Sequence, residues 1–498
     1  MRTVIRGGWV VGHAKGSHTL IPGGEVAFEG DAILFAGRKF EGHADRVIDA
    51  NGKLVAPGFI DTHVHCGHRA PGRLIADTGR ADYFGQPFFE YTVPRKGTFI
   101  AGDPRYAPPG REAASVVGEF TDYTVVELLR NGITTFVEFG ARVHVQEALA
   151  RSLERFGLRG YLGAGYGGGR WTTGEGGRIE WVEDAETGAR LFDQAVEFAK
   201  RIDGTLGGRA RAILVPSGID TASRIQLEAT LNVARELDVP VATHGAYSIW
   251  EFYDTVRRRL ATPIEYLEQL GLLDLGPRLN IGHGNFVAEH PKLAYSGGRD
   301  IERMGAHGCT VSHCAINLVR RARHLHHWKR YREAGVNLTL GSDTYPRDMI
   351  MQMRTASYFG KVAAGDIASA SAPEVFSAAT LGGATSLGRD DLGRLAPGAK
   401  ADIVLIDLSG RDTLRYGPVR DPIRSLVECG VGDDVDTVIV DGRICMSGRV
   451  IPGLDLAALR DAAQRSGEFM WDHWHEWDPQ ERTAERVNPW SYPLEEQP

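Results

Sequence analysis

Two histidines separated by one residue, His63 and His65, are the pair in this chain whose type and spacing point most directly to chemistry. They follow a short apolar stretch, Leu54 to Ile60, which is predicted to be a buried strand. On an extended backbone, residues i and i+2 point to the same side. Two imidazoles on one side at a strand end can hold one divalent metal ion. Two surface histidines are the alternative, and the rest of the chain has to decide.

Three further polar side chains each follow the apolar core of a strand-like segment: His244, His283 and Asp343. If these strands are parallel, their carboxyl ends meet on one face of the fold, and the five side chains converge there. Neutral imidazoles and a carboxylate form a suitable ligand set for Zn²⁺ or another late first-row ion, with water in the open position. The set as a whole therefore favours a metal site.

The elements that must position these residues change pattern twice along the chain. Residues 1–55 indicate short strands separated by Gly-rich turns, and the strand pattern returns after residue 400. Between them, strand, loop and helix alternate, which predicts an α/β fold with a parallel sheet, most simply a closed (β/α)8 barrel over residues 56–395. We expect the two flanking β segments to share one small sheet. The clearest strands are 132–139, 160–165, 210–215, 239–244, 279–283 and 336–343, and the helices include 186–202, 223–237 and 300–307.

Composition narrows the class of protein. With 498 residues, 42% hydrophobic and 24% charged, the chain resembles an ordinary globular protein, and its net charge of −7 gives no support to nucleic-acid binding. We find no apolar stretch long enough for a membrane span and no signal peptide at the start. Five scattered cysteines favour a reducing cytoplasm over a disulfide framework.

Two segments stand apart from the alternating pattern. Residues 77–111 form a long insertion rich in aromatic residues, Pro and Gly, and it includes Phe84 and Phe88. A loop of this length is usually functional, so we expect a lid that contacts substrate, with surface packing as the alternative. The C-terminal extension, residues 456–498, is too apolar for a disordered tail. We expect it to pack on the barrel or on a partner subunit in a homo-oligomer, a dimer or higher. Its tryptophans are Trp471, Trp474, Trp477 and Trp490.

The stretch Val55-Ala56-Pro57-Gly58-Phe59-Ile60-Asp61-Thr62-His63-Val64-His65 resembles the opening motif of the amidohydrolase superfamily. His244, His283 and Gly341-Ser342-Asp343 continue the resemblance, and residues 379–402 are similar to its closing segment. The nearest branch resembles the cytosine-deaminase-like enzymes, which include triazine hydrolases and aromatic deaminases.

This resemblance implies a metal-bearing barrel with a composite β-sandwich built from residues 1–55 and 396–455. It implies one metal ion held by four side chains and favours zinc, although iron, manganese and cobalt also suit such ligands. It also implies that Asn317, in the run Thr310 to Asn317, contacts substrate. The four implied ligands are His63, His65, His244 and Asp343.

The chain departs from this branch at two places. The branch carries Glu three residues after the third histidine, where it shuttles a proton to a ring nitrogen, and this chain has Tyr247 there. Tyr247 either donates a hydrogen bond in place of that Glu or only packs. The segment from Ile213 to Ser217 offers no lysine that could be carboxylated into a metal bridge, so we expect a single ion.

The expected mechanism follows from this site. The ion activates water, Asp343 acts as general base and then as acid to the leaving group, and His283 stabilises the developing oxyanion or carries a proton. A glycine-rich run, Gly165 to Arg170, lacks the spacing of a phosphate-binding loop and predicts a mobile loop beside the pocket, with Tyr166 and Arg170 near substrate.

Two weaker candidates remain on the sequence. The base-rich run from Arg320 to His327 indicates a solvated face or an anchor for an anionic or polar substrate. Cys66 adjoins the histidine pair without ligand spacing, and we expect it to pack.

The sequence therefore predicts a mononuclear metal hydrolase of a small molecule, acting on carbon–nitrogen bonds other than peptide bonds. The missing Glu favours an amide, urea or carbamate-like bond of an aromatic or heterocyclic compound. An aromatic aminohydrolase (a deaminase) or a triazine-type dechlorinase is the alternative. A catalytically dead scaffold is a third hypothesis, which the retention of all implied ligands opposes.

Overall fold

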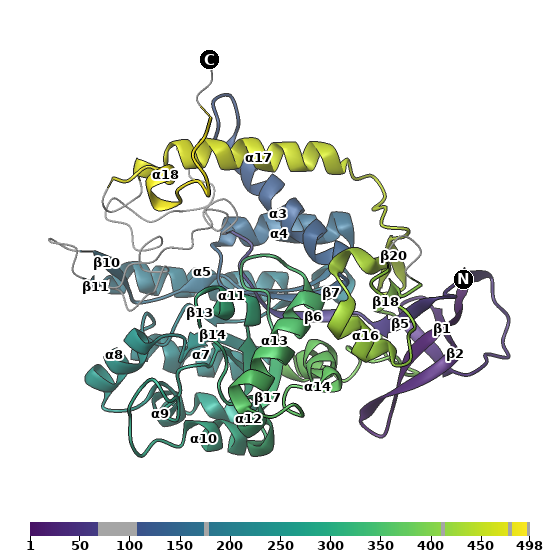
Figure 1. Ribbon diagram of the computed structural model, residues 1–498. Coiled ribbons are helices and arrows are strands. Elements are labelled where there is room, and N and C mark those ends of the chain that lie inside the picture. The colour runs from purple at the N-terminus through teal and green to yellow at the C-terminus, as the bar shows by residue number, and fades with distance from the viewer. Residues whose placement is uncertain (68–106, 174–178, 410–413, 477–480, 496–498) are drawn as a thin grey trace.

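The structure is a computed structural model that describes residues 1–67, 107–173, 179–409, 414–476 and 481–495. The chain has a mixed α/β fold in which a central set of parallel strands is surrounded by helices, and a second sheet lies at one end (Figure 1). The described residues include no helix long and apolar enough to cross a membrane.

The central strands pair in parallel, as the alternating sequence pattern predicts. They form one sheet in the order β12-β8-β7-β6 and another in the order β14-β15-β16-β17. Isolated parallel bridges connect Leu214 with Val241 and Val64 with Asp343, at the two places where these sheets meet. The strands are β6 (Phe59–Val64), β7 (Ile133–Glu138), β8 (Arg159–Leu162), β12 (Ala210–Ala212), β14 (Val241–Gly245), β15 (Leu279–His283), β16 (Thr310–His313) and β17 (Asn337–Leu340).

Two short pairs supplement them. Strand β9 (Gly165–Tyr166) pairs in parallel with β13 (Val215–Pro216), and β10 (Gly169–Thr173) forms an antiparallel hairpin with β11 (Ile179–Glu183). The glycine-rich run from Gly165 to Arg170 is therefore mostly strand, and the expectation of a loop is wrong. Backbone hydrogen bonding explains the difference, because Ser217 N donates to Tyr166 O over 2.9 Å.

Helices connect the central strands, and the three that the sequence predicts are confirmed. The segment 223–237 becomes α7 because the Ser223 hydroxyl and the Gln226 side chain cap each other's backbone N–H groups. The helices are α3 (Ala113–Arg130), α4 (Val143–Phe156), α5 (Ala185–Ile202), α6 (Thr205–Gly208), α7 (Arg224–Leu237), α8 (Ile249–Arg259), α9 (Pro263–Gln269), α10 (Asp300–His307), α11 (Ala315–Arg320), α12 (Trp328–Ala334), α13 (Met349–Ala364), α14 (Ala372–Ser377), α15 (Gly383–Ser386), α16 (Pro422–Cys429), α17 (Leu456–Asp472) and α18 (Ala484–Val487).

Both ends of the chain contribute to one eight-stranded sheet, as the flanking strand patterns predict. Its order is β20-β19-β18-β5-β1-β2-β3, with β4 beside β1. The two ends meet where β5 and β18 pair antiparallel, with Val55 opposite Leu405. The strands are β1 (Arg2–Ala14), β2 (Ser17–Glu29), β3 (Ala32–Gly37), β4 (Arg46–Asp49), β5 (Lys53–Pro57), β18 (Ile403–Asp407), β19 (Val435–Val440) and β20 (Arg443–Met446).

The apolar stretch before the histidine pair is two strands rather than the single strand that the sequence predicts. Gly58 separates β5 from β6 and donates its N–H to Asp402 O over 2.9 Å. A Cβ at Gly58 would lie 2.1 Å from Thr134 Oγ1, so only glycine fits this crossing. The chain thereby passes at residue 58 from the terminal sheet into the central strands.

A buried ion cluster joins the two sheet systems. Arg159 on β8 is 1% exposed, and its Nη2 lies 3.3 Å from Asp402 Oδ1. Asp402 precedes β18, and the same guanidinium also pairs with Asp441, which follows β19. Because one guanidinium bridges two carboxylates of the terminal sheet, the central strands and the terminal sheet are fixed to each other by hydrogen-bond geometry as well as by apolar contact.

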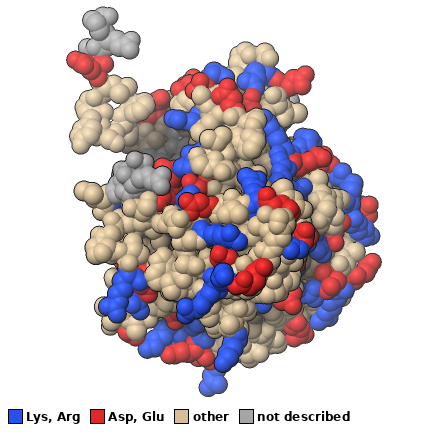
Figure 2. All heavy atoms as spheres, turned by 90° about the vertical axis from the view of Figure 1, so that its right-hand side faces the viewer, with Lys and Arg blue, Asp and Glu red and all other residues tan. Residues whose placement is uncertain are grey.

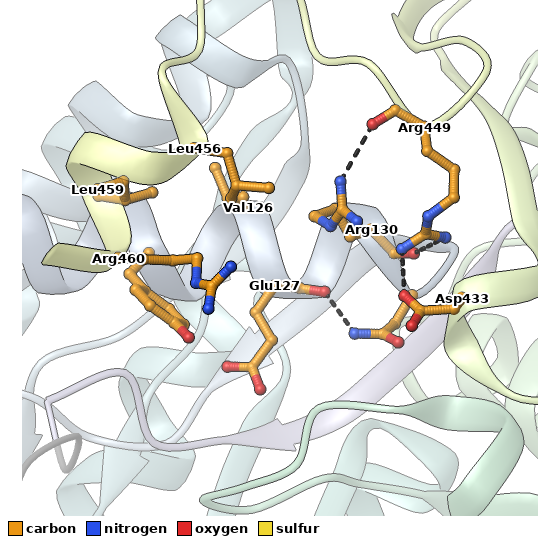
Figure 3. Close-up of a pocket in the computed structure, with 10 residues that line it drawn as sticks. Val126, Glu127, Arg130, Asp433, Arg449, Leu456, Leu459 and Arg460 are labelled. Atoms are coloured by element: carbon orange, nitrogen blue, oxygen red, sulfur yellow. Dashed lines mark hydrogen bonds and ion pairs between the residues drawn. The ribbon is translucent and has the colours of Figure 1, made fainter. Parts of the chain in front are cut away.

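The C-terminal extension packs on the fold. Helix α17 lies along α3 (Figure 1), and Phe120 of α3 packs against a cluster that includes the buried Trp474 and Met470. Trp490 is exposed, and Trp477 lies outside the described residues. Where α17 begins, a cavity of about 220 Å³ remains against α3, with Arg130 and Arg460 among its lining residues (Figure 3).

Charge is mixed on the molecular surface. On the face drawn in Figure 2, basic and acidic side chains alternate without a patch of one sign. That distribution agrees with the overall net charge of −7 and gives no basic surface for a nucleic-acid backbone on this face.

The ion cluster yields a test of how the two sheet systems are joined. We expect Arg159→Ala to lower the free energy of unfolding by about 3–5 kcal/mol, because the buried Asp402 and the half-buried Asp441 lose their cation. Arg235→Ala, which removes an exposed ion pair with Asp274, should cost less than about 1 kcal/mol. Urea unfolding followed by circular dichroism compares the two variants. Equal midpoints would show that the cluster does not join the sheets.

Candidate metal centre

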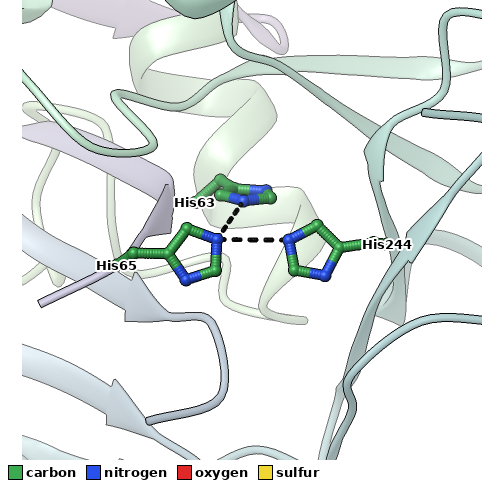
Figure 4. Close-up of side chains that lie close together, drawn as sticks. All are labelled: His63, His65 and His244. Atoms are coloured by element: carbon green, nitrogen blue, oxygen red, sulfur yellow. Dashed lines mark hydrogen bonds between the residues drawn. The ribbon is translucent and has the colours of Figure 1, made fainter. Parts of the chain in front are cut away.

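Three histidines face one another at the carboxyl ends of two central strands. His63 lies in β6, His65 directly follows it, and His244 lies in β14. His65 Nε2 is 3.3 Å from His63 Nε2 and 3.1 Å from His244 Nε2 (Figure 4). The i, i+2 spacing therefore places both imidazoles of the first strand on one side, toward the third.

Asp343 and His283 complete the cluster. The Asp343 carboxylate lies 3.6 Å from His65 Nε2 and 3.8 Å from His283 Nε2. Ligand atoms of His63, His283 and Asp343 lie within 4.8 Å of one another, as do those of His63, His65 and His244. The structure thus brings together every residue that the strand-end pattern predicts for the metal site.

The donor atoms fit a divalent ion. Two ligands bound at about 2.0–2.1 Å in tetrahedral geometry lie about 3.4 Å apart, close to the separations of the histidine Nε2 atoms. His244 Nδ1 contacts Ser217 O, and because a carbonyl only accepts, the proton is on Nδ1 and the lone pair is on Nε2. Burial lowers the pKa of His63 and of His283 well below 6.5, which keeps both in the neutral form that binds metal.

Backbone conformation turns two of these side chains toward the others. His283 has φ of 73° and Asp343 has φ of 62°, both in the left-handed region that side chains other than glycine rarely adopt. Asp343 is held there by two backbone hydrogen bonds of 2.7 Å, from its N–H to His63 O and from His65 N–H to its own carbonyl. The strain is thus maintained by strand pairing at the site itself.

A buried carboxylate, Asp61, stabilises the same pairing between β6 and the residues before Asp343. Asp61 Oδ1 accepts the N–H of His63 over 3.2 Å and that of Ser342 over 3.0 Å. Burial raises the pKa of Asp61 to about 6, against the hydrogen bonds that lower it. Asp61 therefore joins the backbone of β6 at His63 to the backbone at Ser342, the residue before Asp343.

A buried arginine supports His65 from behind. Arg347 is 1% exposed and donates from Nη2 to His65 O over 2.8 Å. Its Nη1 lies 2.9 Å from Glu127 Oε2 of α3, so the guanidinium is itself held by a helix. Sequence analysis did not identify Arg347, since it lies in the turn after β17, where no periodic pattern singles out a residue.

Asn317 and Tyr247 both lie beside the cluster. The Asn317 amide on α11 donates to Asp343 Oδ2, so it orients the candidate base. The Tyr247 ring centroid is 6.3 Å from that of His244, and its hydroxyl donates to Asp220 Oδ2 over 2.9 Å. Tyr247 is therefore engaged in a specific hydrogen bond near the histidines, beyond packing.

Other predicted substrate contacts lie elsewhere. The Tyr166 hydroxyl hydrogen-bonds Thr230 Oγ1 of α7 over 2.7 Å and its ring packs against Phe192 of α5, so this side chain faces the helix layer. Its prediction as a substrate contact is not supported, because an aromatic ring in a short parallel strand is drawn into the apolar layer. Arg170 is exposed on β10. Phe84 and Phe88, with most of the predicted lid, lie outside the described residues.

The two weaker candidates of the sequence pack against their neighbours. Cys66 is fully buried, as expected. In the base-rich run, the Arg320 guanidinium stacks on the Tyr345 ring at 4.0 Å and that of Arg323 on Phe286 at 5.6 Å. The run is therefore only partly solvated.

Two buried carboxylates near the site escaped sequence analysis. Glu138 ends β7 and accepts the N–H groups of Gly140 and Ala141, each over 3.0 Å, and burial raises its pKa to about 7. The strand-end rule that identified Asp343 applies equally to Glu138 and would have found it. Asp220 lies in the turn before α7, a position that no pattern in the sequence indicates.

Comparisons with known proteins agree with this geometry. The model of the amidohydrolase family matches residues 54–445. A 5-methylthioadenosine/S-adenosylhomocysteine deaminase from Natronomonas pharaonis is 30% identical over 84% of this chain and 88% of its own.

Solved structures share the fold at lower identity. An adenosine deaminase from Xanthomonas campestris with bound zinc has a TM-score of 0.75 at 22% identity, covering 94% of this chain and 98% of its own. A zinc complex of atrazine chlorohydrolase from Arthrobacter aurescens has a TM-score of 0.77 at 22% identity, covering 93% of this chain and 100% of its own.

The histidine cluster predicts how metal content responds to substitution. We expect His244→Ala to lose the bound metal, because one of three converging nitrogens disappears, and His43→Ala, an exposed histidine on the terminal sheet side, to retain it. Metal analysis of the purified proteins by mass spectrometry checks this. Equal metal content in both variants would contradict the site.

The arginine behind His65 provides a second test. Arg347→Met should weaken metal affinity by about 10–100-fold, since partners that orient a ligand have effects of that size. Arg347→Lys keeps the charge but cannot bond Glu127 and His65 O as a fork, so it should restore little. Chelator competition measures both affinities. Wild-type affinity in Arg347→Met would exclude a supporting role.

Proposed function

The chain belongs to the amidohydrolase family, and we propose that within it the protein is an aminohydrolase that replaces an amino group on a heterocycle by oxygen and releases ammonia. It is a metal-dependent enzyme acting on carbon–nitrogen bonds other than peptide bonds. The observation that carries the proposal is the convergence of three histidines, His283 and Asp343 in a chain that is 30% identical to a 5-methylthioadenosine/S-adenosylhomocysteine deaminase.

The chain's own residues have distinct tasks in this reaction. When bound, the ion, which we propose is zinc, supplies Lewis-acid activation of water and of the substrate. Asp343 accepts the proton of the attacking water and returns it to the leaving nitrogen. Asn317 holds one oxygen of that carboxylate through a hydrogen bond, which leaves the other oxygen for the proton.

His283 has a separate task. Its Nε2 lies 3.8 Å from Asp343 Oδ2, and burial keeps the ring neutral. A neutral imidazole that carries one proton stabilises negative charge developing on the substrate oxygen or nitrogen without repelling the metal.

We also propose the architecture that this chemistry requires. The two parallel sheets and the bridges between them support a (β/α)8 barrel over residues 56–395, in which every ligand lies at a strand's carboxyl end. The terminal sheet supports a composite β domain from residues 1–55 and 396–455, with residues 456–498 as an extension. A homo-oligomer and a cytoplasmic location remain predictions of the sequence.

Hydrolysis of an amide, urea or carbamate-like bond is the second candidate. One observation favours it: position 247 carries Tyr where the resemblance implies a proton-shuttling Glu. Such bonds release an amine and need no protonation of an aromatic ring nitrogen.

A substrate panel separates the two candidates. We expect the metal-loaded protein to release ammonia from 5-methylthioadenosine, S-adenosylhomocysteine or an aminotriazine, measured with a coupled ammonia assay, and to leave anilides, phenylureas and aryl carbamates intact. Amine release from the latter group alone would establish the second candidate. Turnover of neither group by protein that binds no metal would indicate a dead scaffold.

A matched variant ties any activity to the site. Asp343→Asn removes the proton acceptor while keeping the side-chain shape, so turnover should fall by about 10²–10⁴-fold. His43→Ala, far from the cluster, should retain the wild-type rate. A fast Asp343→Asn variant would exclude the role assigned to that carboxylate.

A further inference from the structure

A buried carboxylate lies next to the position where the family resemblance implies Glu. Tyr247 lies three residues after His244, and its hydroxyl donates to Asp220 Oδ2 over 2.9 Å. The indole N–H of Trp171 donates to the same oxygen over 2.8 Å. Asp220 is therefore held by two donors from two different elements, α8's preceding turn and the β10–β11 hairpin.

The backbone around Asp220 adjoins the metal centre. Gly218 forms a parallel bridge with His244, and the Ile219 N–H donates to His244 O over 3.1 Å. The charge of Asp220 acts on this histidine: burial lowers the pKa of His244, while Ser217 O, Asp343 and Asp220 oppose that effect. Asp220 thus lies in the turn that follows β13, on the side of His244.

One oxygen of Asp220 lacks a hydrogen-bond donor. The residue is 4% exposed, and its buried Oδ1 accepts no hydrogen bond from the part of the chain that the structure describes. A buried carboxylate oxygen without a donor is costly, so its presence needs an explanation, and a ligand that donates a hydrogen bond is one. Burial raises the pKa of Asp220, while the hydrogen bonds from Trp171 and Tyr247 oppose that effect.

The charged neighbours of Asp220 do not fill that site. Arg258 donates to the backbone O of Asp220 over 3.0 Å, while its guanidinium pairs with Asp254 and stacks on the Trp181 ring at 4.9 Å. Glu251 faces the same region, but it is a second acid, and its oxygens accept the N–H groups of Ala246 and Tyr247.

We propose that Asp220 supplies, from a different strand end, the carboxylate that position 247 lacks, and that its Oδ1 accepts a hydrogen bond from the N–H of the substrate's scissile nitrogen. Tyr247 and Trp171 position the carboxylate by occupying Oδ2. The chemical class of ligand is an amino compound whose N–H points away from the metal. The identity of the substrate in this inference rests on the proposed function. The hydrogen bond to Asp220 Oδ1 does not depend on it.

Asp220→Asn tests the hydrogen bond. The amide oxygen can still serve Trp171 and Tyr247, but its NH2 group then faces the substrate N–H, donor against donor. We expect kcat/KM on the best panel substrate to fall by about 10–100-fold with metal content unchanged. Asp300→Asn alters a buried aspartate that also accepts two hydrogen bonds, from Thr262 and Ala288, and should keep the wild-type kcat/KM. Wild-type kcat/KM in Asp220→Asn, or an equal fall in Asp300→Asn, overturns the proposal.

Relocating the carboxylate distinguishes a substrate contact from a structural role. In the double variant Asp220→Asn with Tyr247→Glu, the carboxylate returns to the position of the family motif, and kcat/KM should recover about tenfold over Asp220→Asn. A purely structural Asp220 predicts no recovery. If Asp220→Asn fails to fold, the variant Tyr247→Phe tests the proposal instead. It removes one hydrogen-bond donor to Asp220 Oδ2 and should lower kcat/KM several-fold. An unchanged kcat/KM overturns the proposal.

Failure of the proposed function remains distinguishable. If no panel compound releases ammonia, binding of 5-methylthioadenosine to the metal-loaded protein is measured by calorimetry. Wild type should then bind this compound about 10–100-fold more tightly than Asp220→Asn. Ammonia release by wild type therefore tests the reaction, and the ratio between wild type and variant tests Asp220. Equal binding overturns the Asp220 proposal whatever the reaction proves to be.

Discussion

The pairing of β6 with the residues that follow β17 is the constraint on which the site depends. Two short backbone hydrogen bonds connect Asp343 with His63 and His65, and Asp61 braces the same seam from beneath. These contacts hold Asp343 in a left-handed conformation that turns its carboxylate toward the histidines. The metal centre therefore depends on strand pairing between segments 280 residues apart. A substitution that opens this pairing disturbs the orientation of Asp343 even though every ligand side chain is still present.

The residues of the candidate metal centre could be predicted from the sequence because they obey a simple rule. Each follows the apolar core of a strand, and parallel strands bring such positions together whatever the loops do. Helices such as α7 were equally predictable, since their caps and periodicity are local. The division of residues 54–60 into two strands was not, because it depends on Gly58 meeting Thr134, a contact that no local pattern shows.

Residues that support the ligands could not be predicted from the sequence for the same reason. Arg347 and Asp220 lie in turns, and each acquires its importance from a partner distant in sequence, Glu127 for one and Trp171 for the other. Tyr166 illustrates the reverse case: a glycine-rich run interpreted as a loop beside the pocket suggested a substrate contact, but the ring joins the helix layer. Sequence periodicity thus locates the face of a site, while the choice among side chains on that face requires the packing.

The sheet shared by both termini has a consequence for biosynthesis. Val55 in β5 pairs with Leu405 in β18. During synthesis, β5 therefore cannot form this pairing until β18 has been made, roughly 20–70 s later at ordinary elongation rates. In the same way, His63 cannot form its backbone hydrogen bond with Asp343 until residue 343 has been made. The ligand set is complete only after Asp343 of the 498 residues has been made, so the ion binds after the first strands have formed and cannot guide their early folding.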